Sequence, residues 1–477
     1  MQRVDNQNTK IVATLGPASD SKEMMLELIK EGVDVFRINF SHGSHEQHLE
    51  TIQRIHELNK ETGLHIGILA DLQGPKLRVG KIEGDGIELK KGDRITFTNE
   101  ECIGNSERVY MSYDKFPTDV QAGERVLLDD GKLVFRVVNT NKLDKVELEV
   151  LFGGKLSSNK GVNLPETAIS LPSLTEKDLK DLEFLMGQDV HWIALSFVRS
   201  SRDIKGLREI LKENNHPAKI IAKIEKPEAI AKIDKIIKHA NAIMVARGDL
   251  GVEVPIEELP ALQKEIIKKC IQAGKPVIVA TQMMESMIEN PSPTRAEVTD
   301  VANAVLDGAD AVMLSAETSV GKHPARVVQA MNKIIEEAEK HYHLDAKRPS
   351  PNPASKTFYS DVVCITSARM AEEVNASAII GMTVSGYTAF KVSSYRPDCD
   401  IYIFSTNHHI LATLNLVWGV RCFYYGKFTT TDETHKDVEQ ILKENTDIKK
   451  GDVIINTGAM PIEERGRTNM MKISIVK

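Results

Sequence analysis

Eight short apolar segments along the chain each end in a polar or charged residue, and most are followed by a stretch with helical spacing. Near-continuous runs of Val, Ile and Ala are typical of strands buried on both faces, and their alternation with helices predicts a parallel sheet. Eight such units predict an α/β fold with a closed (β/α)8 barrel, whose chemistry lies at the C-terminal ends of the strands. The segments are 10–15, 33–39, 65–72, 190–197, 219–225, 242–249, 276–283 and 311–317.

Two stretches interrupt this pattern. Residues 75–171 alternate apolar and polar positions around Asp-Gly and Asn-rich turns, which predicts antiparallel hairpins and an inserted small β-barrel lid domain. The proline-rich segment 345–356 has the composition of a linker, and the runs beyond it predict an open α/β domain. We expect a catalytic barrel from 1–74 and 172–344, the lid at 75–171, and a C-terminal regulatory domain at 357–477.

Composition narrows the class of protein. With 477 residues, 41% hydrophobic and 27% charged, the chain is ordinary for a globular protein of several domains. Its formal net charge of −7 argues against a nucleic-acid partner, since phosphate backbones select basic faces. The five cysteines are scattered, with no CxxC, and there is no signal peptide and no apolar run of about 18 residues. We therefore expect a cytoplasmic protein without a membrane partner.

The segment AKIEKPEA at 222–229 places Lys223 and Glu225 two residues apart at the end of a strand. Both side chains then lie on the same face. An ammonium and a carboxylate are costly in the apolar helix layer, so the mouth of the barrel lumen is favoured. The alternative is an ion pair that only caps the barrel.

The segment MVARGDLGVEVP at 244–255 adds a second acidic residue, because an apolar strand stops at Arg247, Gly248 and Asp249. Carboxylates of Glu225 and Asp249 on adjacent strand ends form a hard, oxygen-rich site suited to Mg²⁺ or Mn²⁺. The alternative is a salt-bridged barrel rim, in which Arg247 forms an ion pair with Asp249.

Cations around this pair suit phosphate binding. Arg37, Lys223, Arg78 and Lys160 can hold phosphates as forks or point charges. No GxxxxGK[ST] motif and no clear dinucleotide fingerprint occur, so side chains and a metal must hold any nucleotide. Thr281, at the end of the seventh strand, is a plausible donor to a carboxylate or enolate oxygen.

Eight ordered motifs extend along the chain: FRINFSHG (36–43), ADLQGPKLR (70–78), NKGVNLP (159–165), AKIE (222–225), MVARGDLGVE (244–253), ATQMMESM (280–287), PTRAEVTDVANAV (293–305) and MLSAETSVGKHP (313–324). Taken together, they resemble the pyruvate kinase family over the whole chain. The resemblance implies a barrel with a β lid and a C-terminal α/β domain, in a cytosolic homotetramer. It implies transfer of the phosphoryl group of phosphoenolpyruvate to ADP, giving pyruvate and ATP in the last step of glycolysis.

The resemblance also implies roles for individual residues. Glu225 and Asp249 match the divalent-metal ligands, and Lys223, Arg37 and Thr281 the catalytic residues. The phosphoenolpyruvate contacts match Arg37, Lys223, Gly248, Asp249 and Thr281. The nucleotide contacts match Asn39, Phe40, Ser41, His42, Arg78 and Lys160. The ligands of a monovalent cation match Asn39, Ser41, Asp71 and Leu72.

The monovalent site departs from the pattern of potassium-dependent members, which typically have Thr at the position of Leu72 and Glu at that of Lys76. Leu72 offers no hydroxyl oxygen, and the Lys76 ammonium would repel K⁺ within a few Å. With Gln73 and Val79, these residues resemble the potassium-independent branch. We predict activity without added K⁺. A second departure is Val320, where many relatives have a nucleotide-contacting Lys; whether Lys322 replaces it is open.

In the C-terminal domain, TVSGYTAFKVSSYRP at 383–397 runs from a strand through a Ser-Gly turn into a helix. Backbone N–H groups and hydroxyls at a helix start can bind an anion. Thr383, Ser385, Gly386 and Thr388 resemble the effector loop of the family, for a sugar phosphate or AMP, with 458–471 placed to close over it. An ordinary Ser-Gly helix start is the alternative.

Two other functions share parts of this pattern. A metal-dependent oxoacid aldolase on the same barrel would also hold an enolate with Glu and Asp, but it does not explain the insert and its Lys160. A catalytically dead sensor of phosphate ligands would use only the C-terminal loop, and it predicts loss of the charged rim residues that this chain retains.

Overall fold

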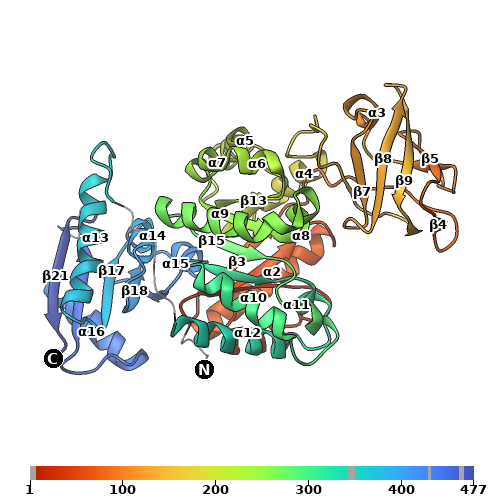
Figure 1. The fold of residues 1–477 in the computed structure, drawn as a ribbon. Helices are drawn as coiled ribbons and strands as arrows, with labels where there is room; N and C mark the ends of the chain where they lie inside the picture. Colours follow the sequence, from red (N-terminus) through yellow and green to blue (C-terminus); the bar gives the residue numbers. More distant parts are fainter. Residues whose placement is uncertain (1–6, 342–349, 428–430, 461–466) are drawn as a thin grey trace.

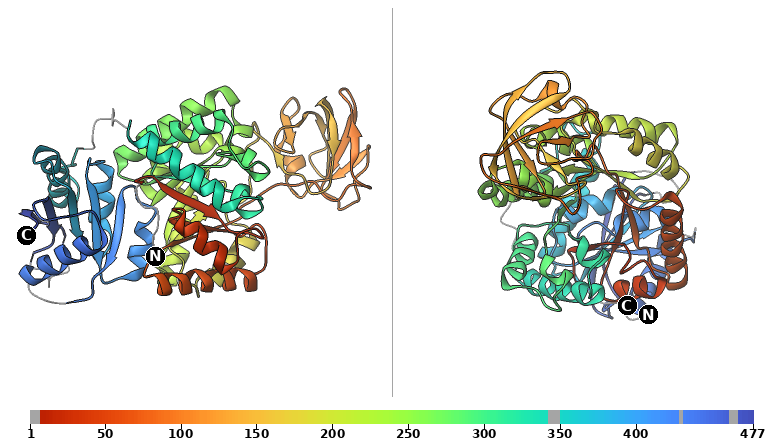
Figure 2. Two further views of the ribbon diagram at one scale, coloured as in Figure 1. Left: turned by 90° about the horizontal axis from the view of Figure 1, so that it is seen from below. Right: turned by 90° about the vertical axis from the view of Figure 1, so that its right-hand side faces the viewer.

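The computed structural model describes residues 7–341, 350–427, 431–460 and 467–477. Three bodies lie in a row: a central barrel, a β-rich insert at one end and an α/β unit at the other (Figures 1 and 2). The insert and the C-terminal unit therefore lie at opposite ends of the barrel.

The central body is a closed barrel of eight parallel strands, in the order β1-β16-β15-β14-β13-β12-β3-β2. Each strand lies within one of the eight apolar segments, which confirms the predicted (β/α)8 fold. The strands are β1 Lys10–Thr14, β2 Val35–Asn39, β3 Gly67–Asp71, β12 Trp192–Leu195, β13 Lys219–Ile224, β14 Ala242–Ala246, β15 Val277–Ala280 and β16 Ala311–Leu314.

Helices surround the barrel, and the longer ones bury apolar residues against the strands. The capping boxes that the spacing of Ser44 with Gln47 and of Thr294 with Glu297 indicates are both present, and they start α2 and α10. The helical elements are α1 Lys22–Lys30, α2 His45–Thr62, α4 Glu176–Leu185, α5 Ser201–Glu213, α6 Pro227–Ala231, α7 Ile233–His239, α8 Arg247–Glu253, η1 Ile256–Glu258, α9 Leu259–Ala273, η2 Glu285–Ile288, α10 Arg295–Leu306, α11 Ala316–Ser319 and α12 Pro324–Glu339.

The insert between β3 and β12 curls into a half-barrel around its own apolar core. Its strands pair antiparallel as predicted, except that β5 and β6 pair in parallel. A six-stranded sheet has the order β11-β7-β8-β9-β5-β6, and β10 pairs with β4. Its elements are β4 Ile87–Leu89, β5 Arg94–Thr98, β6 Arg108–Tyr110, α3 Phe116–Asp119, β7 Arg125–Leu128, β8 Leu133–Thr140, β9 Lys145–Phe152, β10 Gly154–Leu156 and β11 Val162–Asn163.

The C-terminal unit is a five-stranded sheet in the order β19-β18-β17-β20-β21. Four strands are parallel, as the sequence predicts, and the antiparallel edge strand β21 was not expected. The elements are α13 Phe358–Glu373, β17 Ala378–Met382, α14 Tyr387–Ser394, β18 Asp400–Ser405, α15 His408–Leu414, β19 Val420–Tyr424, α16 Thr431–Asn445, β20 Val453–Gly458 and β21 Met470–Ile475.

The C-terminal unit docks on the barrel at the N-terminal ends of the strands. Trp192, at the start of β12, donates from Nε1 to the Thr413 carbonyl at 3.1 Å. Arg396, which is 3% exposed, donates to Asp310 Oδ1 at 3.1 Å and to the Gly308 carbonyl at 2.9 Å. These contacts close the end of the barrel opposite the insert and leave the C-terminal strand ends for chemistry.

The buried Arg396–Asp310 pair should make the docked unit strongly sensitive to substitution. Arg396→Met leaves the Asp310 carboxylate buried without its counter-charge, so we expect a loss of about 3–5 kcal/mol in the free energy of unfolding. Chemical denaturation followed by circular dichroism measures it. As a control, Lys269→Met removes the partner of Asp234, whose side chain is 78% exposed, and should leave the curve nearly unchanged. Equal effects of the two variants would contradict this.

Candidate active site

The charged residues of β2, β3 and β13 point into the barrel lumen. Val35, Leu69 and Ile221 belong to the apolar cluster that fills the lumen, and strand residues two apart share a face. Arg37 and Asp71 therefore extend the lumen face at the C-terminal ends of β2 and β3. On β13, Lys223 and then Glu225 continue the same face, which favours the lumen site over an ion pair in the helix layer.

These side chains form one chain of contacts. Arg37 donates from Nε to Asp71 Oδ2 at 2.7 Å and from its terminal nitrogen to Thr14 Oγ1 at 3.0 Å. Lys223 Nζ lies 3.2 Å from Asp71 Oδ1 and 3.0 Å from Glu225 Oε1. Lys223 also donates to Ser196 Oγ at 2.7 Å. The ammonium of Lys223 is thus shared by two buried carboxylates.

Burial and charge act in opposite directions on this cluster. Burial alone would raise the pKa of Asp71, but Lys223 and Arg37 hold that pKa below its usual value. Burial alone would lower the pKa of Lys223, yet Asp71 and Glu225 raise it above its usual value. Lys223 is therefore a fixed positive charge and not a proton donor near neutral pH.

Glu225 fits the first half of a divalent-metal site. Its Oε2 accepts from the Phe197 amide at 2.6 Å, while its buried Oε1 faces Lys223 without a hydrogen bond of good geometry. Burial, together with the negative charge of Asp249, raises the pKa of Glu225. A nearby divalent cation would offset both effects, because it favours the ionised carboxylate.

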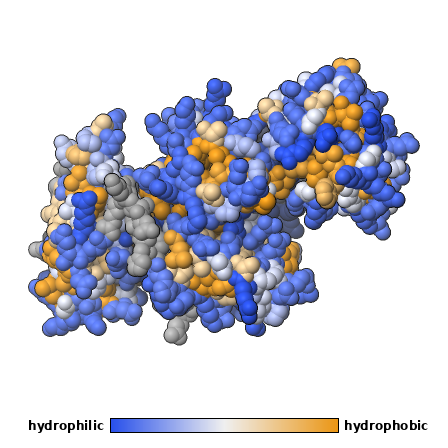
Figure 3. Space-filling model, in the orientation of Figure 1, coloured by the Kyte–Doolittle hydropathy of each residue, from blue (hydrophilic) through white to orange (hydrophobic). Residues whose placement is uncertain are grey.

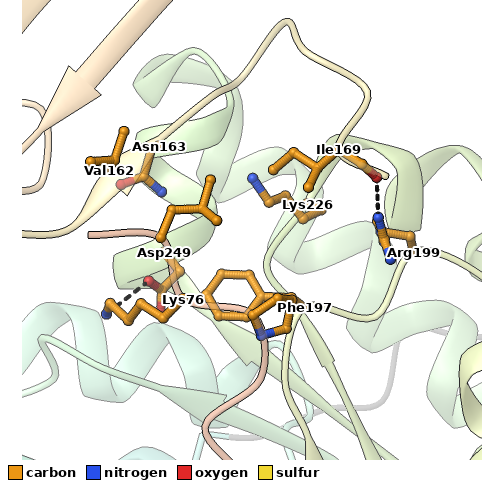
Figure 4. Close-up of a pocket in the computed structure, with 10 residues that line it drawn as sticks. Lys76, Val162, Asn163, Ile169, Phe197, Arg199, Lys226 and Asp249 are labelled. Carbon is orange, nitrogen blue, oxygen red and sulfur yellow. Dashed lines mark hydrogen bonds and ion pairs between the residues drawn. The ribbon is translucent and has the colours of Figure 1, made fainter. Parts of the chain in front are cut away.

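Asp249 fits the second half of that site. It lies in the first turn of α8, which follows β14, and β14 is the direct neighbour of β13. Its Oδ1 is 3.6 Å from Lys76 Nζ (Figure 4). Oxygen donors from adjacent strand ends match what Mg²⁺ and Mn²⁺ prefer.

Arg247 does not hold Asp249, contrary to the alternative raised by the sequence. Its guanidinium instead donates to Asp300 Oδ1 at 2.7 Å and to the Thr281 carbonyl at 2.8 Å. This contact supports an unusual backbone, because Thr281 has φ +71° and the next residue, Gln282, has φ +53°. Such backbone strain is common where side chains are aimed at a ligand.

The side chain of Thr281 is fixed against the start of α8. Its Oγ1 accepts from the Gly248 amide at 2.7 Å and contacts the Ala280 carbonyl at 2.5 Å. Thr281 and Gly248 are thus brought together beside Asp249, as expected for residues that share one ligand.

A cleft of about 420 Å³ separates the barrel rim from the insert (Figure 4). Arg199 closes one side of it by donating to the Ile169 and Leu171 carbonyls at the exit of the insert. The cleft is lined by Pro75, Lys76, Leu77, Val162, Asn163 and Asp249, among others.

The residues expected to hold nucleotide lie in two groups. In the insert, Arg78 donates to the Asn159 carbonyl at 2.9 Å, and Lys160 Nζ pairs with Asp129 Oδ1 at 2.8 Å. Neither lines the cleft described above. Both side chains are held by neighbours within the insert.

The second group lies on the barrel loop after β2. The Phe40 side chain is buried, its carbonyl accepts from Lys177 at 2.5 Å and its amide donates to the Asp71 carbonyl at 3.0 Å. Asn39 Oδ1 accepts from the Ser41 amide at 3.1 Å, and the His42 amide donates to the Asn39 carbonyl at 3.3 Å. The tight turn fixes this loop against the barrel.

The residues matched to the monovalent site are largely engaged by protein groups. Both oxygens of Asp71 face cations, as described above. The Leu72 carbonyl accepts from Ser196 Oγ at 2.8 Å, and the Leu72 side chain is 1% exposed.

The effector-type loop forms a turn that uses its own hydroxyls. Thr383 Oγ1 accepts from the Gly386 amide at 2.9 Å, and Gly386, with φ +81°, precedes α14. Thr388 Oγ1 lies 2.5 Å from Thr468 Oγ1, and Ser385 Oγ accepts weakly from the Tyr387 amide at 3.5 Å. Thr468 belongs to the stretch 458–471 expected to close over the loop, of which 461–466 lie outside the described residues.

Sequence reasoning missed several residues of the site. Ser196 and Phe197 follow β12 and are not among the residues that the sequence predicts for the site. Lys226 and Glu253 lie within the motifs noted above, and a search for charges next to each predicted ligand would have found them. Glu317, which the strand pattern put on the rim, instead accepts from the Met284 and Ser315 amides at 3.2 and 2.7 Å. Lys322 contacts Glu289 at the surface.

Over the described part of the chain, no helix combines the length and apolar character needed to cross a bilayer. Figure 3 shows polar residues interspersed with apolar patches on one face of the molecule.

Known proteins match this chain over almost its whole length. Residues 6–328 match the barrel domain of pyruvate kinase, and residues 361–474 match its alpha/beta domain. The pyruvate kinase of Corynebacterium glutamicum is 42% identical over 471 residues, covering 99% of this chain and 98% of the relative. That of Geobacillus stearothermophilus is also 42% identical, covering 98% of this chain and 80% of the relative.

Solved structures agree as well. The crystal structure of a pyruvate kinase from Cryptosporidium parvum superposes with a TM-score of 0.91 at 36% identity, covering 99% of this chain and 97% of that one. Both the sequence and the arrangement of the three bodies are shared. This chain belongs to the pyruvate kinase family.

Proposed function

We propose that the charged cluster at the barrel rim carries out the reaction of this pyruvate kinase, the transfer of a phosphoryl group from phosphoenolpyruvate to ADP. The single observation that supports this most is Lys223, whose ammonium lies within 3.2 Å of both Asp71 and Glu225 at the lumen mouth. The Lys223 side chain is only 11% exposed, so its charge acts on a bound polyanion with little screening by water.

The work of the site is to bring two polyanions together and to neutralise them. Lys223 and Arg37 stabilise the phosphoryl group in flight and the enolate oxygen that remains. Glu225 and Asp249 are the residues that would hold Mg²⁺ or Mn²⁺. When bound, that ion would supply further positive charge to the phosphoryl and carboxylate oxygens.

Thr281 and Gly248 bind and orient the substrate next to Asp249. The Gly248 amide donates to the Thr281 hydroxyl at 2.7 Å, and that hydroxyl donates to the Ala280 carbonyl, so a carboxylate or enolate oxygen would take over these donors from the protein. The enolate is then protonated at carbon, and a water near Thr281 is the candidate route for this proton.

The nucleotide lies between the insert and the loop after β2. Arg78 and Lys160 approach its phosphates from the insert, and Asn39, Phe40, Ser41 and His42 form the barrel side. Since Lys160 is paired with Asp129, nucleotide phosphate must displace that contact. The insert, with the boundaries 75–171, then acts as a lid that excludes water.

The family assignment weighs against the two alternatives. An oxoacid aldolase would not need a match that extends through the C-terminal domain, and a dead sensor would not need the intact rim. The proposed function is therefore phosphoryl transfer by a complete site.

We further propose that the enzyme belongs to the potassium-independent branch. Lys76 Nζ lies 3.6 Å from Asp249 Oδ1, so a fixed ammonium already stands beside the acidic pair. The Leu72 carbonyl is used by Ser196, and Leu72 has no side-chain oxygen. The charge that K⁺ supplies elsewhere would come from Lys76.

We also propose how the enzyme is regulated, how it assembles and where it is located. Thr383, Ser385, Gly386 and Thr388 would take a sugar phosphate or AMP, because hydroxyls and backbone N–H groups gather at the start of α14. The anion would replace the contacts that the Gly386 and Tyr387 amides make with Thr383 and Ser385. A homotetramer and a cytoplasmic location follow from the resemblance to the family.

Substitution of Lys223 tests the catalytic assignment. Lys223→Met should lower kcat at least ~10²–10³-fold in a coupled assay of lactate formation, because the charge that stabilises the transition state is lost. Lys219→Met, on the same strand at the opposite end of the barrel, is the matched control and should keep its turnover. Near wild-type turnover of a folded Lys223→Met enzyme would refute the role of Lys223.

Substitution of Lys76 tests the potassium proposal. In tetramethylammonium buffer the wild-type enzyme should be fully active, and adding K⁺ should change its rate little. Lys76→Glu replaces the resident ammonium by a carboxylate and should make the rate depend on K⁺. Strong activation of the wild type by K⁺ would contradict the proposal.

A further inference from the structure

Two buried charged residues beside the site have no role in the reaction described so far. Lys226 and Glu253 are 6% and 5% exposed, and Lys226 Nζ donates to Glu253 Oε1 at 2.5 Å. They come from different segments: Lys226 directly follows Glu225 after β13, whereas Glu253 ends α8, four residues after Asp249.

The ion pair therefore joins the two segments that carry the acidic pair. Residues four apart lie on the same side of a helix, so Glu253 anchors α8 on the side that bears Asp249. Lys226 anchors the end of β13 next to Glu225. A buried pair is held in one geometry more firmly than a solvated one, because either partner alone would be an uncompensated charge.

The insert contacts the same carboxylate. Asn163, in β11, donates from Nδ2 to Glu253 Oε1 at 2.8 Å. Glu253 Oε2 is buried and has no hydrogen-bond partner among the residues that the structure describes. Figure 4 shows Lys226 extending from the barrel side towards Asn163 of the insert. One oxygen thus links β13, α8 and the lid.

We propose that Lys226 and Glu253 are positioning residues that set the separation of Glu225 and Asp249, and that Asn163 couples this separation to the lid. The inference rests on the proposed role of Glu225 and Asp249 as divalent-metal ligands. Residues that orient metal ligands contribute to affinity without touching the ion.

Substitution of Lys226 separates positioning from simple electrostatics. Lys226→Met removes a positive charge near the acidic pair, and Coulomb's law alone then predicts tighter binding of a divalent cation. Loss of positioning predicts weaker binding. The direction of the change in affinity therefore distinguishes the two.

The experiment measures Mn²⁺ binding to the full-length enzyme, without substrates, from the electron paramagnetic resonance signal of free Mn²⁺. Lys226→Met should raise the Kd for Mn²⁺ about tenfold. The double variant Lys226→Met, Glu253→Gln should do the same; it leaves no unpaired buried charge, and its Gln still accepts from Asn163. Circular dichroism checks that both variants fold. An unchanged or lower Kd in the double variant would overturn the proposal.

Asn163 tests the coupling to the lid. Asn163→Ala should leave the Kd for Mn²⁺ of the free enzyme unchanged and should raise the KM for ADP several-fold at saturating Mn²⁺. Asn139→Ala, at an exposed position of β8 in the same sheet, is the control and should change neither. An unchanged KM for ADP in Asn163→Ala would overturn the coupling.

The Glu225→Gln variant distinguishes a failure of the metal assignment from a failure of the positioning role. If this variant binds Mn²⁺ as the wild type does, the metal assignment itself is wrong. If Glu225→Gln weakens binding and the Lys226 variants do not, only the positioning role is wrong.

Discussion

The structure depends on one constraint: charged side chains that a closed barrel buries at its rim must neutralise one another. Lys223 satisfies this by standing between Asp71 and Glu225, with Arg37 on the far side of Asp71. An unpaired charge at this depth would be costly. The same arrangement leaves a fixed positive charge and an acidic pair at the open end, which is what a reaction between polyanions requires.

The two ends of the barrel are used differently. The C-terminal unit covers the N-terminal strand ends through buried contacts such as Arg396 with Asp310. The insert stands over the opposite end and touches the rim through few polar contacts, among them Asn163 with Glu253. The firmly docked C-terminal unit keeps one end of the barrel rigid. The insert is attached by fewer polar contacts, so it can move and admit substrates at the other end.

Much of this architecture could be predicted from the sequence, because a strand buried on both faces needs a continuous apolar run and each barrel strand supplies one. The edge strand β21 was not predicted: Lys472 and Ser474 interrupt its Met and Ile residues, none of its residues is fully buried, and among the described strands it pairs with β20 alone. The role of Arg247 was also open, since its partner Asp300 lies 53 residues away. Periodicity carries no information on contacts at that separation.

The sequence by itself determined the barrel, the insert, the C-terminal sheet and the family, since local periodicity and ordered motifs are properties of the chain. Only the tertiary structure decided which charges meet. That Lys226 shares Glu253 with Asn163, and that Lys76 faces Asp249, depends on where three distant segments converge. Ion pairs follow from distances in space, and a linear pattern fixes such distances only within one helix or strand.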